Sequence, residues 1–202
     1  MKLHVTMTSP YARMARAAVL EHNLQDRVEV CRARTRETNS PYYAITPSGR
    51  VPYLGLDDGR GIEDSQLICA YFDAIGNGPP LAWDYHSPTW EYTRLLGLAR
   101  STMEGISVLA REIRRPEEDR SASILAHEKA RNTRQTDLWE TLVDHPLMQG
   151  RINMVQLIIY CGFDALTLYT LADSTPERPA LQAWRKELSK RPSLAATVPP
   201  AP

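Results

Sequence analysis

Two short polar segments, Ser9 and Asp64–Ser65, each stand directly before a stretch of residues with the spacing of a helix. Residues 10–23 carry apolar side chains at helical intervals, and Pro10 suits a first helical turn, where its missing N–H costs nothing. A second apolar run, residues 67–72, follows Asp64 and Ser65. Side-chain oxygens at such positions cap a helix, and the free N–H groups of its first turn attract anions. The sequence therefore predicts two helix starts that can hold anionic groups, with a hydroxyl at each.

The Val51–Pro52 bond precedes a predicted strand, a position where proline is often joined by a cis peptide bond that marks a tight turn. If the bond is cis, the N–H and C=O groups of Val51 turn away from the sheet. An extended peptide could then pair with Val51 as an added strand would. Together with the two helix starts, this edge indicates a site for a small peptide that carries a carboxylate.

The predicted elements follow the order strand, helix, strand, then a two-stranded hairpin and a closing helix, at residues 2–7, 10–23, 28–31, 53–56 with 61–62, and 64–74. A segment rich in glycine and proline follows and marks a boundary. Beyond it only helical patterns occur, over residues 89–115, 123–143, 153–168 and 179–190. We therefore expect a domain at 1–76, a linker at 77–87 and an all-helical domain at 88–202.

Asn153 and Gln156 lie three residues apart, ahead of an apolar run. This is the spacing of a capping box, in which the first side chain caps the helix and the second reaches back to the cap. The pair therefore predicts where the third long helix begins.

Four motifs, in this order and at this spacing, resemble those of the cytosolic glutathione S-transferases, of a serine-type, bacterial-like kind. They are Thr8-Ser9-Pro10-Tyr11 with Arg13, Ser48 to Leu54, Glu63 to Ile68 leading to Tyr71, and Arg178 to Leu181 with Trp184 ahead of Arg191-Pro192-Ser193. The resemblance spans nearly the whole chain. It implies a thioredoxin-like α/β N-terminal domain, an all-α C-terminal domain, glutathione as co-substrate and a homodimer.

By this resemblance, Ser9 is the hydroxyl that stabilises the glutathione thiolate. A free cysteine thiol has a pKa of about 8.5, and a hydroxyl bond to charged sulfur is worth roughly 1.5 to 3 kcal/mol, which would lower that pKa to roughly 6.5 to 7.5. Tyr11 and then Thr8 are the rival hydroxyls, and Ser9 could instead be a plain helix cap. Family members that exchange disulfides usually have cysteine at this position, so serine favours conjugation.

The resemblance also implies which residues bind the other parts of glutathione. Asp64–Ser65 would hold its γ-glutamyl end, with the ammonium on the carboxylate of Asp64. The glutamyl carboxylate would meet the helix N-terminus and the hydroxyl of Ser65. Arg50, and second Arg36, would meet the glycyl carboxylate, while Val51–Pro52 supplies the docking edge. The alternatives are an ordinary capping pair and two surface arginines.

A hydrophobic electrophile would bind between Ser9 and the helical domain, above Tyr11 and against the first long helix around Met103, Ile106 and Ser107. Apolar residues at helical spacing are equally compatible with a packed core. Both interpretations stay open at this point.

Composition restricts the other functions. The 24 basic residues balance 24 acidic ones, so no surface for nucleic acid or an anionic membrane is expected. The sequence has no run of roughly 18 apolar residues and no signal-peptide core, which favours a cytoplasmic protein. Three cysteines form no CxxC pair and five histidines are scattered, so no metal is expected. We expect a glutathione transferase; the alternatives are a glutathione-binding protein with little turnover, or a glutathione-dependent isomerase, lyase or peroxidase.

Overall fold

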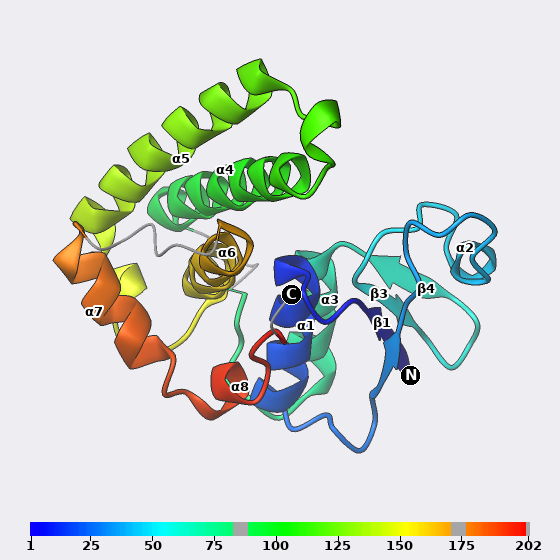
Figure 1. Cartoon of the computed structure of the whole chain (residues 1–202). Helices are drawn as coiled ribbons and strands as arrows, with labels where there is room; N and C mark the ends of the chain where they lie inside the picture. Colours follow the sequence, from blue (N-terminus) through cyan, green and yellow to red (C-terminus); the bar gives the residue numbers. More distant parts are fainter. Residues whose placement is uncertain (83–88, 171–176, 201–202) are drawn as a thin grey trace. The chain divides into compact units, whose positions relative to one another are not determined.

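Four short strands near the start of the chain form one mixed sheet, in the order β2-β1-β3-β4 (Figure 1). The strands are β1 (Lys2–Val5), β2 (Glu29–Arg32), β3 (Tyr53–Gly55) and β4 (Gly61–Glu63). β1 pairs parallel to β2 and antiparallel to β3, which in turn pairs antiparallel to β4. The predicted thioredoxin-like order is thus confirmed in this computed structural model, which describes residues 1–82, 89–170 and 177–200.

Two helices, α1 (Pro10–Glu21) and α3 (Ser65–Ile75), lie side by side on one face of the sheet (Figure 1). Leu3, Val5 and Leu54 are fully buried, because alternate residues of a strand point to the same face and these three point to the helices. The core of this unit therefore lies between the sheet and the pair α1 and α3.

The other face of the sheet carries α2 (Tyr42–Ile45). His4 points to this face, and its ring centroid lies 5.7 Å from that of Tyr42. This helix was not predicted, because four residues are too few to display a helical period.

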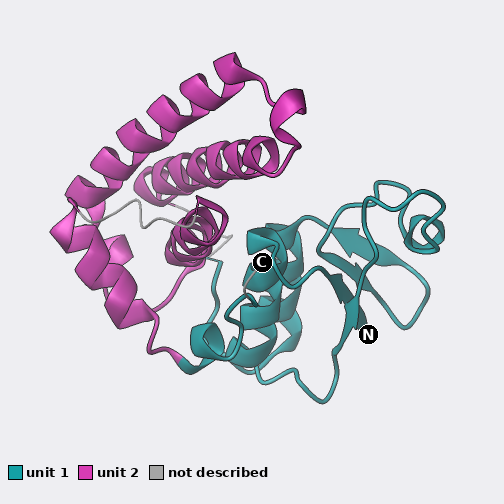
Figure 2. Ribbon diagram, in the orientation of Figure 1, with its two compact units in different colours: residues 1–84, 192–200 teal, residues 85–191, 201–202 magenta. Residues whose placement is uncertain are grey.

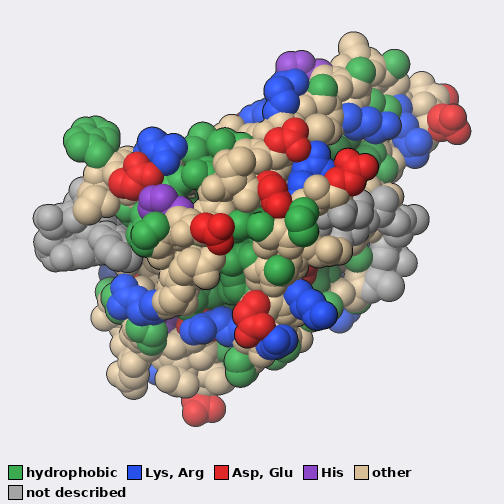
Figure 3. Space-filling model, turned by 90° about the vertical axis from the view of Figure 1, so that its left-hand side faces the viewer, with side chains coloured by type: hydrophobic (Ala, Val, Ile, Leu, Met, Phe, Trp, Pro, Cys, Tyr) green, Lys and Arg blue, Asp and Glu red, His purple; other side chains and the backbone are tan. Residues whose placement is uncertain are grey.

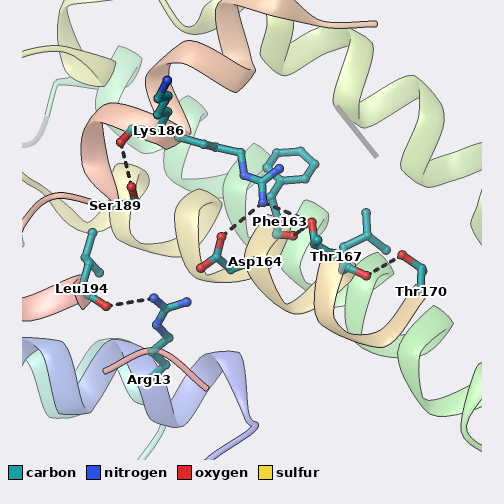
Figure 4. A network of polar contacts seen from close by, with 10 residues as sticks. Arg13, Phe163, Asp164, Thr167, Thr170, Lys186, Ser189 and Leu194 are labelled. Atoms are coloured by element: carbon teal, nitrogen blue, oxygen red, sulfur yellow. Dashed lines mark hydrogen bonds and ion pairs between the residues drawn. The ribbon is translucent and has the colours of Figure 1, made fainter. Parts of the chain in front are cut away.

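The chain divides into two compact units, residues 1–84 with 192–200 and residues 85–191 with 201–202 (Figure 2). The C-terminal helix α8 (Pro192–Ala195) thus folds with the first unit. There, Nη2 of Arg13 donates a hydrogen bond of 3.0 Å to the carbonyl of Leu194 (Figure 4), and the hydroxyl of Ser193 donates to the carboxylate of Glu21. This division differs from the expected one, which assigned every residue after 87 to the second domain. Part of the expected linker, residues 83–87, lies outside the described ranges.

The described part of the second unit is helical, with α4 (Trp90–Ile113), α5 (Ala122–Leu142), α6 (Met154–Thr170) and α7 (Pro179–Leu188). Short 3-10 turns lie at Glu117–Asp119 and Pro146–Met148. The four long helices were predicted, and their observed ends differ from the expected ones by at most two residues. α6 is buried along most of its length, and α4 packs against it. Nη2 of Arg185, on α7, donates to Oδ1 of Asp164 at 3.2 Å and joins α7 to α6 (Figure 4).

Asn153 caps α6, as expected from the sequence. Its Oδ1 accepts the N–H groups of Val155 at 3.0 Å and Gln156 at 3.2 Å. The side chain of Gln156 donates to the carbonyl of Leu147 at 3.0 Å, and Nδ2 of Asn153 donates to the same oxygen at 2.7 Å. The capping box is therefore correct for its first residue, whereas its second residue ties down the preceding turn.

Candidate active site

The register of the sheet brings three of the predicted segments to one end of it. The first residue of β3 pairs with a residue near the end of β1 and with the last residue of β4. Ser9 follows β1, Val51–Pro52 precedes β3 and Asp64–Ser65 follows β4, so all three lie beyond the same end of the sheet. The helices α1 and α3 also begin there, and the positive ends of their dipoles favour an anion.

Ser9 is the N-cap of α1. Its backbone is extended, with φ −74° and ψ 124°, and its Oγ accepts the N–H of Ala12 at 3.2 Å. A serine hydroxyl has two acceptor lone pairs and one hydrogen to donate. The cap uses a lone pair, and no described residue accepts the hydrogen. The capping and thiolate-binding interpretations of Ser9 are therefore compatible in one geometry.

Asp64 is the N-cap of α3, and Ser65 is the first residue of the helix. Oδ1 of Asp64 accepts the N–H groups of Gln66 at 2.8 Å and Leu67 at 3.2 Å. Asp64 has φ 73° and ψ 123°, a backbone conformation that is uncommon outside glycine and that clusters at functional sites. Its second oxygen, Oδ2, accepts no hydrogen bond from the described residues. This exposed carboxylate oxygen can accept an ammonium group from a ligand.

Ser65 is 3% exposed, and its hydroxyl has no hydrogen-bond partner among residues 1–82, 89–170 and 177–200. The sequence left open which residue of the pair caps α3, and the structure assigns the cap to Asp64. The hydroxyl of Ser65 consequently remains available at the start of the helix.

The predicted cis bond between Val51 and Pro52 is present. Val51 is half-buried and precedes β3, so it takes no part in the ladder. Neither its N–H nor its C=O has a partner in the described part of the chain. Val51 thus presents one donor and one acceptor to an extended ligand.

Three hydrogen bonds that were not predicted from the sequence hold the loop leading to Val51. Oε1 of Glu63 accepts the hydroxyls of Thr46 at 2.5 Å and Ser48 at 2.9 Å. The hydroxyl of Tyr42 donates to the carbonyl of Arg50 at 2.5 Å. Burial, reinforced by the nearby charge of Glu63, raises the pKa of Tyr42 to about 12, so this hydroxyl keeps its proton at neutral pH. No local pattern signals these bonds, because Thr46 and Glu63 are 17 residues apart.

The two candidate arginines, Arg36 and Arg50, are both exposed, and neither guanidinium forms an ion pair within the described ranges. Arg36 has φ 64°, and its N–H donates to the hydroxyl of Tyr43 at 3.1 Å. Arg50 directly precedes Val51, whereas Arg36 lies in the segment after β2. Both guanidinium groups are consequently available to an anion. Arg50 is the nearer of the two in the sequence to the docking edge at Val51.

The candidate electrophile residues fall in different units. Tyr11 is half-buried in α1, whereas Met103, Ile106 and Ser107 lie in α4. Met103 and Ile106 are 1% and 0% exposed, and a Cβ placed on Gly162 of α6 would lie 3.3 Å from Cδ1 of Ile106. This packing against α6 fits the core interpretation for these two side chains. Ser107 is half-buried and remains the more accessible of the three.

The face of the molecule drawn in Figure 3 is not dominated by one charge. Basic and acidic side chains are mixed over the face drawn in Figure 3. Among the described residues, no group of three or more histidine, cysteine, aspartate or glutamate side chains could hold a metal ion. None of the described helices combines the length and apolar character needed to cross a membrane.

Comparison with known proteins agrees with this fold. Residues 3–80 match the family described as glutathione S-transferase, N-terminal domain. The chain is 26% identical to the uncharacterized GST-like protein YibF of Escherichia coli (strain K12), over 99% of both chains. It is also similar to the crystal structure of a glutathione transferase family member from Pseudomonas fluorescens Pf-5 with bound glutathione, at TM-score 0.87 and 25% identity over 98% of each chain.

A second structure of a Pseudomonas fluorescens Pf-5 family member, with bound S-(propanoic acid)-glutathione, matches at TM-score 0.84 and 26% identity, over 98% of this chain and 99% of that one. The thioredoxin-like α/β unit and the helical region together define the fold of the glutathione transferases. Residues 3–80 thus match the N-terminal domain of the glutathione S-transferases, and the chain as a whole is similar to glutathione transferase family members.

Proposed function

We propose that this protein is a glutathione transferase that binds glutathione at the sheet end and adds its thiolate to a hydrophobic electrophile. The observation that carries the proposal is the hydroxyl of Ser9, which accepts the N–H of Ala12 and keeps its own hydrogen without an acceptor in the described residues. The glutathione bound in the similar Pseudomonas fluorescens proteins supports the same ligand here.

Ser9 would lower the pKa of the bound thiol. Its hydroxyl would donate to the sulfur, and the N-terminus of α1, a helix of 12 residues, would add a favourable field. A hydrogen bond to a charged atom is worth roughly 1.5 to 3 kcal/mol, which corresponds to about one to two pKa units. A thiol with a pKa near 8.5 would then be largely ionised at about pH 7.5. The thiolate is the nucleophile, so this shift would set the rate of attack at neutral pH.

The rest of glutathione would bind along the same end of the sheet. Oδ2 of Asp64 would accept the γ-glutamyl ammonium, and the hydroxyl of Ser65 with the first turn of α3 would hold the γ-glutamyl carboxylate. The N–H and C=O of Val51, next to Pro52, would pair with the peptide backbone of the ligand. Arg50, with Arg36 second, would meet the glycyl carboxylate. Every one of these groups has the charge or hydrogen-bonding capacity that its assigned partner requires.

For the electrophile, we propose Tyr11 in α1 of the first unit, and Met103, Ile106 and Ser107 in α4 of the second unit, as candidate residues. The half-buried side chains of Tyr11 and Ser107 support direct contact with a substrate. Because Met103 and Ile106 are buried, we propose that they support Ser107 within α4 without touching the substrate. The proposal also includes a cytoplasmic homodimer that takes part in detoxification, and sedimentation at micromolar concentration tests the dimer.

Calorimetric titration with glutathione, followed by turnover of 1-chloro-2,4-dinitrobenzene with glutathione, tests the proposed function. We expect binding in the millimolar range or tighter and measurable conjugation. No heat at millimolar glutathione would contradict both the transferase and the simpler glutathione-binding protein. Binding without turnover across several electrophiles would favour the binding protein. Turnover of a peroxide or an isomerisable substrate in place of the halide would favour one of the other glutathione-dependent reactions.

A further inference from the structure

Glu63 is the last residue of β4 and directly precedes Asp64, whose backbone is held at φ 73°. Its carboxylate contacts the loop that leads to Val51. There, Oε1 accepts the hydroxyls of Thr46 at 2.5 Å and Ser48 at 2.9 Å. One oxygen atom thus joins the start of α3 to the loop that leads to Val51.

The loop has further hydrogen bonds that converge on the same point. The hydroxyl of Ser48 accepts the N–H of Arg50 at 3.2 Å. Because the same hydroxyl donates to Glu63, Ser48 links Glu63 to Arg50, the residue before Val51. On its other side, the carbonyl of Arg50 accepts the hydroxyl of Tyr42 at 2.5 Å. Arg50 is therefore held through both its N–H and its C=O. Its guanidinium makes no ion pair in the described part of the chain and leaves the backbone as the fixed element.

Glycine at position 49 lets this loop pass close to α2. Gly49 has φ 62°, and a Cβ there would lie 2.6 Å from Cε1 of Tyr43. The loop is thus packed against α2 on one side and tied to Glu63 on the other. Without the carboxylate, the hydroxyls of Thr46 and Ser48 would lose the charged acceptor that they share, and hydrogen bonds to charged acceptors are the stronger ones.

We propose that Glu63 is a positioning residue for glutathione: it holds the backbone of Val51 and the carboxylate of Asp64 in the spacing that one ligand requires. This inference rests on the proposed function. Glu63 itself touches neither the thiol nor the electrophile in this arrangement. Its contribution is preorganisation, because a loop that is already ordered loses less conformational entropy when the ligand binds.

Glu63→Leu removes the acceptor, whereas Glu63→Gln keeps an Oε1 that can accept both hydroxyls. For Glu63→Leu we expect the dissociation constant of glutathione, measured by calorimetry, to rise about five- to twentyfold. The pKa of the bound thiol and kcat should stay within about twofold of the parent values. Glu63→Gln should restore the affinity to within about threefold. Asp58→Leu, which removes an exposed carboxylate from the turn of the same hairpin, is the matched control and should leave the affinity unchanged.

The double variant Thr46→Val with Ser48→Ala removes the other side of the same contact. Its loss of affinity should match that of Glu63→Leu, and adding Glu63→Leu should cause no further loss, because residues of one network are not additive. Equal losses in Asp58→Leu, full additivity, or a shift in the thiol pKa with unchanged affinity would overturn the proposal.

A readout that needs no glutathione distinguishes failure of this inference from failure of the proposed function. Trypsin cleavage at the Arg50–Val51 bond, followed by mass spectrometry, should be at least about fivefold faster in Glu63→Leu than in the parent or in Asp58→Leu, because the local opening of a released loop is easier. Unchanged cleavage would refute the restraint itself. Faster cleavage of Glu63→Leu than of the parent, together with a parent that binds no glutathione, would leave the restraint intact and overturn both the proposed function and the positioning role.

Discussion

Nε2 of His22 lies 2.7 Å from Oδ1 of Asp73, and the two side chains are 0% and 9% exposed. The same carboxylate accepts the N–H of Leu81 at 2.8 Å and of Ala82 at 2.7 Å. One buried carboxylate thus joins the C-terminal end of α1 to the segment that follows α3. This segment runs very close to α1, since a Cβ on Gly78 would lie 2.0 Å from the carbonyl oxygen of Glu21.

Asp73→Asn should therefore destabilise the first unit. The amide keeps one acceptor oxygen but replaces the other with an N–H₂ group, which faces either a backbone N–H or the imidazole. We expect a loss of about 1 to 3 kcal/mol in the free energy of unfolding, the usual cost of an unsatisfied buried partner. Urea unfolding followed by circular dichroism measures it. Asp58→Asn, at an exposed ion pair with Arg60, is the control and should unfold as the parent does. Equal midpoints for the two variants would contradict the role of Asp73.

Ser9→Ala should raise the pKa of the bound thiol by roughly one to two units and lower turnover at neutral pH about 10- to 100-fold. The loss should shrink as the pH is raised, because the thiol then ionises without help. Glutathione affinity should barely change. The pH dependence of kcat and the thiolate absorbance of bound glutathione give the two quantities.

Because Ser9 also caps α1, its replacement by alanine is expected to cost about 1 kcal/mol of stability as well. Ser9→Gly separates the two effects, since glycine is tolerated at an N-cap but has no hydroxyl. It should be nearly as stable as the parent and as inactive as Ser9→Ala. Full activity in either variant would transfer the role to Tyr11, which Tyr11→Phe then tests, with Thr8→Val after it.

Asp64→Asn should weaken glutathione binding without disturbing the fold. Asparagine tolerates a positive φ and keeps an oxygen for the N–H groups of Gln66 and Leu67. The loss of the negative charge should raise the dissociation constant about tenfold, because the γ-glutamyl ammonium loses its counter-charge. Calorimetry at pH 7 and thermal unfolding are the measurements. A lower melting temperature of Asp64→Asn with unchanged affinity would show that Asp64 only caps α3 and does not bind glutathione.

Ser65→Ala should also weaken affinity, by roughly 1 to 3 kcal/mol, through the loss of a partner for the γ-glutamyl carboxylate. The pKa of the bound thiol should stay as it is. Ser9→Ala is thus expected to change the thiol pKa but not the affinity, whereas Ser65→Ala is expected to change the affinity but not the thiol pKa. If both variants lose affinity equally, the proposed separation of roles is wrong.

His4→Phe should make stability less sensitive to acid. Burial, with the charge of Lys2 in addition, lowers the pKa of His4 below the ordinary 6.5. The unfolded chain therefore takes up a proton at higher pH than the folded one, and stability falls as the pH drops through about 6.5. Phenylalanine keeps a ring next to Tyr42 and removes this proton uptake. Urea unfolding at pH 7.5 and 5.5 should show a smaller loss for His4→Phe than for the parent. His127→Phe, on the exposed side of α5, should show the loss of the parent, and identical losses in all three would contradict the role of His4.

Local signals in the sequence located part of the site. Ser9 and Asp64 are cap-forming residues directly before apolar runs, and both are N-caps in the structure. The choice between Asp64 and Ser65 could not be made beforehand, because both side chains are capable caps. It depends on the backbone at Asp64, which has a positive φ. No neighbouring residue type predicts this conformation.

Contacts between residues that are far apart in the chain could not be predicted from the sequence. The bond from Thr46 to Glu63 closes a loop of 17 residues, and the bond from Arg13 to Leu194 spans 181 residues. Neither has a periodic pattern. Met103 and Ile106 illustrate a different limit, since an apolar residue at helical spacing has the same pattern in a core and in a pocket wall. Their burial and their packing beside Gly162, which the sequence does not show, indicate the core for these two.

The position of residues 192–200 in the first unit bears on the synthesis of the protein. A ribosome makes the chain from its N-terminus, so the whole helical unit is translated before Leu194 can reach Arg13. Until then the guanidinium of Arg13, which is 1% exposed in the finished protein, lacks this acceptor. The first unit, whose synthesis begins first, is consequently completed last. A nascent chain released before Leu194 would leave α1 without its contact with α8.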